Sequence, residues 1–216
     1  MHFDFGFYSS LLLIFFVHMI VYAFLLVRKR ILQQLPAPGW LGFFLLLAAL
    51  YISPWMLGFA GWYDTQPYKQ FLLYFPMQHL FAIGPVVYFY VQSLLNPGFV
   101  FTRKQLVHFI PALLYLLFTA WMAVYDFIIA GDTVFLADGT DRDFDTWYQL
   151  SGFVSMLYYF SLSLRYYLFY RDLIRQVLSN ADTLAFKWVR NFLIAILAIL
   201  LARLILMAAG LFADLD

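Results

Sequence analysis

The chain has 216 residues, of which 65% are hydrophobic, 22% aromatic and only 12% charged. This composition excludes an ordinary soluble globular domain and indicates a membrane protein. The formal net charge of +1 excludes little, because basic and acidic residues are segregated along the chain. The absence of Cys excludes a disulfide, a thiol nucleophile and a thiolate metal site.

Six apolar segments reach the length of about 20 residues that a helix needs to cross a bilayer. Because lipid offers the backbone no hydrogen bonds, each segment is expected to be helical. The predicted spans are approximately Tyr8–Val27, Trp40–Trp62, Phe71–Leu95, Leu106–Ile129, Tyr148–Tyr170 and Phe192–Phe212. The sequence therefore predicts one all-α domain over residues 1–216, a polytopic bundle of six transmembrane helices that has the lipid bilayer as its main partner.

Basic residues fall mainly in the connections after the first, third and fifth spans, as in Arg28–Arg30 and Arg103–Lys104. Cytoplasmic loops are enriched in Lys and Arg. Most of the Asp residues fall on the other side, several of them between residues 132 and 145. We therefore expect the basic connections in the cytoplasm and the N-terminus outside.

The longest cytoplasmic connection, Arg171–Arg190, begins with apolar residues on one helical face and Arg171 and Arg175 beside them. This pattern predicts a short amphipathic helix lying on the lipid headgroups. The alternative interpretation is a docking surface for a cytoplasmic or membrane protein partner.

Arg203 lies near the centre of the last span, where insertion costs roughly 2.5 to 3.5 kcal/mol. Depth counted at about 1.5 Å per residue places polar groups of the other spans level with it. The candidate ligand-binding residues in this layer are Arg203, His79, Gln78, His18 and Tyr158. Tyr51, Ser53, Thr119 and Ser155 share the same depth, whereas Asp126 is roughly 9 Å nearer the outer face, too far for direct pairing.

Two interpretations of this layer stay open. The groups either hydrogen-bond between helices and hold the bundle, or form a pocket in which Arg203 attracts an anionic or dipolar small molecule and the histidines tune it. Two histidines at one depth are also compatible with a haem, but no cofactor and no metal site is predicted. Gly84 and Pro85 are hinge candidates, because Pro85 removes a backbone donor in mid-helix.

The segment HLFAIGPVVYFYVQSLL, followed by NPGFVFTRKQLVHFIPALLYLLF, resembles the membrane-embedded N-terminal half of bacterial AraC-type transcriptional regulators. The matching residues are Gly84, Pro85, Tyr88, Tyr90, Asn96, Pro97, Arg103, Lys104 and His108–Pro111. The resemblance implies a sensor domain in the bacterial inner membrane that acts in transcription regulation. That family also has a seventh span and a cytoplasmic helix-turn-helix, and this sequence contains neither, so we expect no direct contact of this chain with nucleic acid.

The first functional hypothesis is therefore a membrane sensor or signalling domain. A transporter or channel subunit, working as a homo-oligomer, is an alternative that uses the same polar layer and the third span. A structural subunit of a larger membrane complex is another. Enzymatic activity is not predicted, because the hydrolase and phosphate-binding motifs H-E-x-x-H, G-x-S-x-G and the P-loop are missing.

Overall fold

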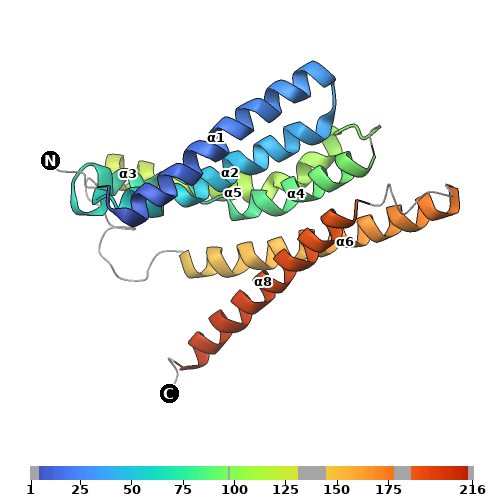
Figure 1. Cartoon of the computed structure of the whole chain (residues 1–216). Coiled ribbons are helices and arrows are strands. Elements are labelled where there is room, and N and C mark those ends of the chain that lie inside the picture. The colour runs from blue at the N-terminus through green and yellow to red at the C-terminus, as the bar shows by residue number, and fades with distance from the viewer. Residues whose placement is uncertain (1–4, 97, 131–144, 178–185, 214–216) are drawn as a thin grey trace.

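The computed structural model describes residues 5–96, 98–130, 145–177 and 186–213. Its long helices are α1 (Phe7–Gln33), α2 (Pro36–Gly58), α4 (Leu80–Leu95), α5 (Ile110–Val124), α6 (Asp145–Val177) and α8 (Lys187–Ala213) (Figure 1). Shorter elements join them: the 3-10 helices η1 (Trp62–Asp64) and η2 (Arg103–Phe109), the helix α3 (Tyr68–Tyr74) and the π-helical turn η3 (Tyr125–Ala130). All regular structure in these residues is helical, which confirms the predicted all-α class.

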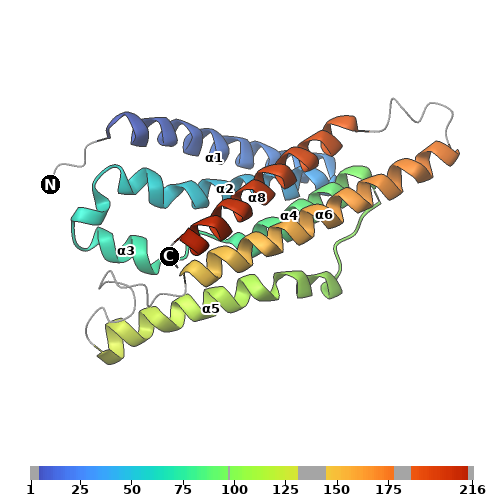
Figure 2. The ribbon, with the colours of Figure 1, turned by 90° about the horizontal axis from the view of Figure 1, so that it is seen from below.

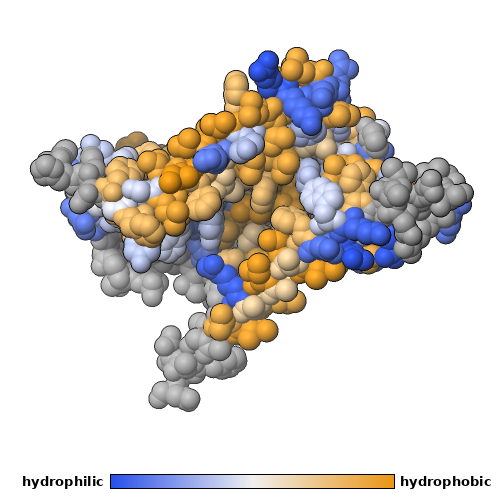
Figure 3. Space-filling model, in the orientation of Figure 1, coloured by the Kyte–Doolittle hydropathy of each residue, from blue (hydrophilic) through white to orange (hydrophobic). Residues whose placement is uncertain are grey.

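The outer surface of the bundle is apolar. Four helical stretches of the described residues are long and apolar enough to cross a membrane: Phe7–Gln33, Pro36–Gly58, Arg103–Ile129 and Lys187–Leu206. Phe7 is 78% exposed and Ile128 is 76% exposed. In Figure 3 the hydrophobic colour covers most of the visible helix surface, and hydrophilic patches concentrate near the α1–α2 turn and the adjoining ends of α6 and α8. Such a surface suits lipid rather than water.

The basic connections gather at one end of the molecule. The α1–α2 turn, the α4–η2 connection and the adjoining ends of α6 and α8 lie there in both views (Figures 1 and 2). The start of α1, the elements η1 and α3, and the end of α8 lie at the opposite end. Arg28–Arg30 and Arg103–Lys104 therefore occupy the same end, as two connections on one side of a membrane must.

Helix α6 packs against α4 and against α8. Its buried residues include Tyr148, Phe153, Phe160 and Tyr167, which join Leu80 and Val91 of α4 in the main core cluster. The α4–α6 contact is close because each helix offers a glycine. A Cβ on Gly152 would lie 2.6 Å from Leu80 Cβ, and one on Gly84 would lie 2.9 Å from Tyr159 Cδ2. Small residues allow this approach of helices where lipid supplies no hydrophobic drive.

The predicted third span, Phe71–Leu95, is wrong as a continuous helix. Helix α3 ends at Tyr74, residues 75–79 are not helical, and α4 begins only at Leu80. Pro76 lies in the interruption and cannot donate a backbone hydrogen bond, so the helix fails there. The 16 residues of α4 span only about 24 Å, less than the roughly 30 Å of a bilayer core.

Gly84 and Pro85, the predicted hinge residues, lie within α4 rather than at its end, and both are buried. The interruption ends at residue 79, five residues before Gly84, where the sequence pattern predicts a bend. The structure gives Gly84 a packing position against Tyr159; whether the Gly84–Pro85 pair moves stays a prediction.

The predicted short amphipathic helix is not a separate element where the structure describes it. Helix α6 runs without a break from Asp145 to Val177, so residues 171–177 continue the predicted fifth span. Residues 178–185 lie outside the described part. Helix α6 is not among the four apolar stretches because Tyr and Ser side chains are frequent along it; α4 and α8 cover part of its surface.

Candidate functional site

A tyrosine of α6 hydrogen-bonds to the backbone at the interruption before α4. The Tyr148 hydroxyl accepts a hydrogen bond from the Leu80 backbone N–H at 2.9 Å and donates one to the Gln78 carbonyl oxygen. Tyr148 is only 2% exposed. Since each unsatisfied backbone group in a membrane interior costs several kcal/mol, one phenol that serves an acceptor inside the break and the first donor after it stabilises the break directly.

Side chains around Tyr148 fix its position. The Tyr115 ring of α5 stacks on the Tyr148 ring with centroids 3.7 Å apart, and the Phe81 ring meets it edge-on at 5.4 Å. The next residue of α6, Gln149, donates from Nε2 to Gln78 Oε1 at 2.7 Å. Three helices therefore hold one polar cluster, which we call the break cluster: Gln78, His79, Tyr148 and Gln149. His79 is the half-buried N-cap residue of α4.

A buried carboxyl lies beside the same interruption. Asp126 is 0% exposed, and the Tyr74 hydroxyl donates a hydrogen bond to its Oδ2. Tyr74 is the last residue of α3, and Asp126 belongs to η3, where the helix widens to π geometry. Turns of this kind recur at functional sites. Ionisable groups inside a membrane domain are expensive and often functional.

Sequence reasoning missed Asp126 as a site residue, because its depth was compared only with that of Arg203. The signal was present: Asp126 is a lone acid between Val124 and Phe127–Ile129, in a run that is otherwise apolar or aromatic. Such a carboxyl has to face protein, and here it faces α3, which the sequence pattern had merged with α4.

Arg203 of α8 is exposed, and its guanidinium carbon lies 4.6 Å from the centre of the Phe153 ring. A cation over an aromatic face is attracted by the ring electrons. Phe153 lies one turn along α6 from Gln149, about 6 Å along the helix axis. Of the predicted layer, the structure brings Gln78 and His79 to the interruption, whereas Arg203 is exposed and lies against Phe153.

His18 and Tyr158 do not join them. His18 is exposed on α1, which packs along α2, and its Nδ1 lies 2.8 Å from the Ile14 carbonyl oxygen of the preceding turn. Tyr158 is 60% exposed and lies nine residues beyond Gln149, about 13 Å along the helix. Equal depth is not sufficient, since a side chain must also face inward.

The site offers hydrogen-bonding groups and one carboxyl rather than a metal-ligand set. Among the described residues, no three His or Asp side chains come together in a way that could hold a metal ion. The break cluster, Tyr74 and Asp126 offer hydroxyl, amide and carboxyl groups for hydrogen bonds to a polar solute.

Comparison with family models, with curated proteins and with solved structures finds no match to this chain.

Proposed function

We propose that this chain is the membrane domain of a sensor, with six crossings of a bacterial inner membrane and its N-terminus outside. The four apolar stretches, α4 and α6 would supply the crossings, with residues 75–79 extending α4 toward the outer face. The main support for the proposal is the interruption of the third crossing, where side chains of α5, η3 and α6 supply hydrogen bonds and a ring contact. Irregular backbone at membrane depth is tolerated where it is buried in protein or lines a cavity.

A structural bundle has no need of this arrangement. A continuous apolar helix would satisfy its own backbone, whereas the break needs Tyr148, Gln149 and the Tyr74–Asp126 pair. A solute that competes for these hydrogen bonds would change the packing of α4 on α6, and α6 extends to the basic end. This change of packing would be the signal to a partner at residues 171–190, in line with the resemblance to AraC-type regulators.

The test is transcription in cells that lack the gene. We expect deletion to change a set of transcripts, and the intact chain to restore them. Arg203→Leu and Asp126→Asn should accumulate in the membrane normally but fail to restore the transcripts, because the first removes the cation over Phe153 and the second removes the buried carboxyl beside the interruption. Arg165→Leu is the matched control, since Arg165 is an exposed arginine elsewhere on α6. If both site variants restored the transcripts fully, these residues would have no part in sensing. If deletion of the gene changed no transcripts, the sensor hypothesis would be wrong.

The interrupted helix also favours a second candidate, a transporter subunit, because transporters build substrate sites at broken membrane helices. Uptake of labelled solutes by proteoliposomes distinguishes the two. Flux that Asp126→Asn abolishes would favour transport, and transcript changes without flux would favour sensing.

A further inference from the structure

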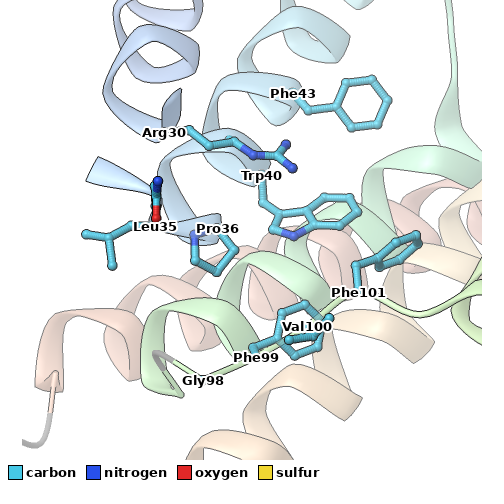
Figure 4. Close-up of a pocket in the computed structure, with 11 residues that line it drawn as sticks. Arg30, Leu35, Pro36, Trp40, Phe43, Gly98, Phe99, Val100 and Phe101 are labelled. Atoms are coloured by element: carbon cyan, nitrogen blue, oxygen red, sulfur yellow. The ribbon is translucent and has the colours of Figure 1, made fainter. Parts of the chain in front are cut away.

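A cavity of about 750 Å³ lies at the basic end, where the α1–α2 turn meets the α4–η2 connection (Figure 4). This volume is within the range of small-molecule sites. It is lined by Arg30, Gln34, Leu35, Pro36, Gly39, Trp40, Phe43, Gly98, Phe99, Val100 and Phe101. The cavity is separate from the break cluster, which contributes none of these residues.

The apolar wall of the cavity is rigid. The Trp40 ring packs against Phe101 at 5.1 Å and against Phe89 at 5.2 Å, and it stacks on Phe109 at 6.3 Å between centroids. Phe43, one turn along α2 from Trp40, is 40% exposed and extends the wall toward the apolar outer surface. A ligand here would find aromatic rings held in place by their neighbours, at low entropic cost.

The polar element of the cavity is the Arg30 guanidinium. Its side chain leaves the last turn of α1 and extends over the start of α2, toward the same side as Trp40 (Figure 4). Among the described residues Arg30 has neither a hydrogen bond nor a carboxylate within 4.0 Å. A Cβ on Gly39 would overlap the Arg30 Cδ atom, so only glycine at position 39 lets the side chain take this path.

Gln34 is a second polar residue at the cavity, and its backbone is in the left-handed conformation. It follows α1 with φ 53° and ψ 27°, the left-handed conformation that favours glycine. A residue with a Cβ is strained in this conformation. The Gln34 amide lies at the cavity and has no hydrogen-bond partner among the residues that the structure describes.

We propose that this cavity binds the phosphate of an anionic phospholipid, with Arg30 and Gln34 on the phosphate oxygens and the first acyl methylenes along Trp40 and Phe43. A guanidinium matches the geometry of phosphate oxygens. The cavity lies where α1 and α2 join, at the end where the basic connections meet. Arg28 and Lys29 precede Arg30 in α1, and Arg103 and Lys104 begin η2, shortly after the lining residues 98–101. The site does not depend on the sensor function or on which end faces the cytoplasm.

The test is titration of the purified full chain in neutral detergent micelles with dioctanoyl phosphatidylglycerol, followed by the shift of the unfolding midpoint. We expect saturable binding that is roughly tenfold or more weaker in Arg30→Gln, because a charge-assisted hydrogen bond is lost. Arg28→Gln, which removes an equal charge from the same helix end outside the cavity, should bind as the native chain does. Dioctanoyl phosphatidylcholine and inorganic phosphate should both bind more weakly, the first for lack of net charge and the second for lack of acyl chains.

Two further variants separate the cavity from general charge. Gly39→Ala keeps every charge but displaces the Arg30 side chain, so it should weaken phosphatidylglycerol binding about as much as Arg30→Gln. Gln34→Gly should raise the ligand-free unfolding midpoint by relieving the left-handed residue, yet weaken binding. A structural defect would lower both quantities together.

Equal effects of Arg30→Gln and Arg28→Gln would overturn the site in favour of surface charge alone. Equal affinity for phosphatidylcholine and phosphatidylglycerol would overturn the anionic lipid. Binding of inorganic phosphate as tight as that of the lipid would identify a site for free anions and would equally overturn it.

Discussion

Single side chains decide whether the break before α4 is stable. Tyr148 is the clearest case, because its one hydroxyl serves the Leu80 N–H and the Gln78 carbonyl. Without it, both backbone groups would be left without this partner in a buried environment. The sequence presents Tyr148 only as the first residue of an apolar segment and gives no sign of this role.

Tyr148→Phe should therefore destabilise the protein by about 1 to 3 kcal/mol, the cost of leaving a buried donor or acceptor unsatisfied. The measurement is the midpoint of reversible unfolding in mixed detergent micelles. Tyr158→Phe is the matched control, since Tyr158 is on the same helix but is exposed. Equal midpoints for the two variants would show that the hydroxyl of Tyr148 does not support the break.

Residue depth could be predicted from the sequence, but facing direction could not. Gln78 and His79 lie at the interruption, whereas Arg203, His18 and Tyr158, predicted at the same depth, are exposed. A small rotation of a helix about its axis changes which residues face a neighbour. That rotation depends on packing contacts such as those between Gly152 and Leu80.

At the scale of elements, the packing of α4 on α6 positions the site. The Leu80 side chain packs against Gly152, and the Tyr159 side chain packs against Gly84. The two helices therefore lie closer than larger residues at these positions would permit. Leu80 is the first residue of α4, beside the break. Any displacement of α4 from α6 therefore acts directly on the hydrogen bonds of Tyr148.

Gly152→Ala should destabilise the protein by about 1 to 3 kcal/mol, because the added methyl group overpacks a filled interface. Combining it with Leu80→Gly, which removes the Leu80 Cβ that the new methyl group would overlap, should recover part of this loss relative to the sum of the single changes. Gly6→Ala, where a Cβ would meet nothing within 4 Å, is the control. Unfolding midpoints of the four variants give the coupling. Strict additivity would contradict the close approach.

Element boundaries could be predicted only in part. The limits of α2 and α8 agree with their predicted spans to within a few residues at most ends, because uniform apolar runs bounded by polar or Pro-containing connections leave little choice. The third span failed, since a 25-residue apolar run conceals a break at Pro76 that is stable only with partners from elsewhere in the chain.

For the whole molecule, the proposed topology follows from the basic connections meeting at one end. The chain has no Cys, so a single introduced Cys reports position without interference. Asp64 lies in η1 and Val100 in the α4–η2 connection, at opposite ends of the bundle, and both are exposed.

We expect Asp64→Cys to react with a membrane-impermeant maleimide in intact cells, and Val100→Cys to react only after the cells are opened, because basic connections are retained in the cytoplasm. Labelling is read as a mass shift on a gel. The native chain, without Cys, is the blank. The reverse pattern would invert the orientation, and labelling of both in intact cells would contradict opposite ends across a membrane.

The sequence alone determined the helical class, the apolar exterior and the separation of basic from acidic connections. These depend on residue composition and on hydrogen bonds within each helix, which are local properties. Only the tertiary structure decided that α4 begins at Leu80, that Asp126 is enclosed with Tyr74, and that Arg30 crosses Gly39 into an aromatic cavity. Each of these joins residues from different helices, and such contacts depend on how the helices rotate and approach one another once they pack.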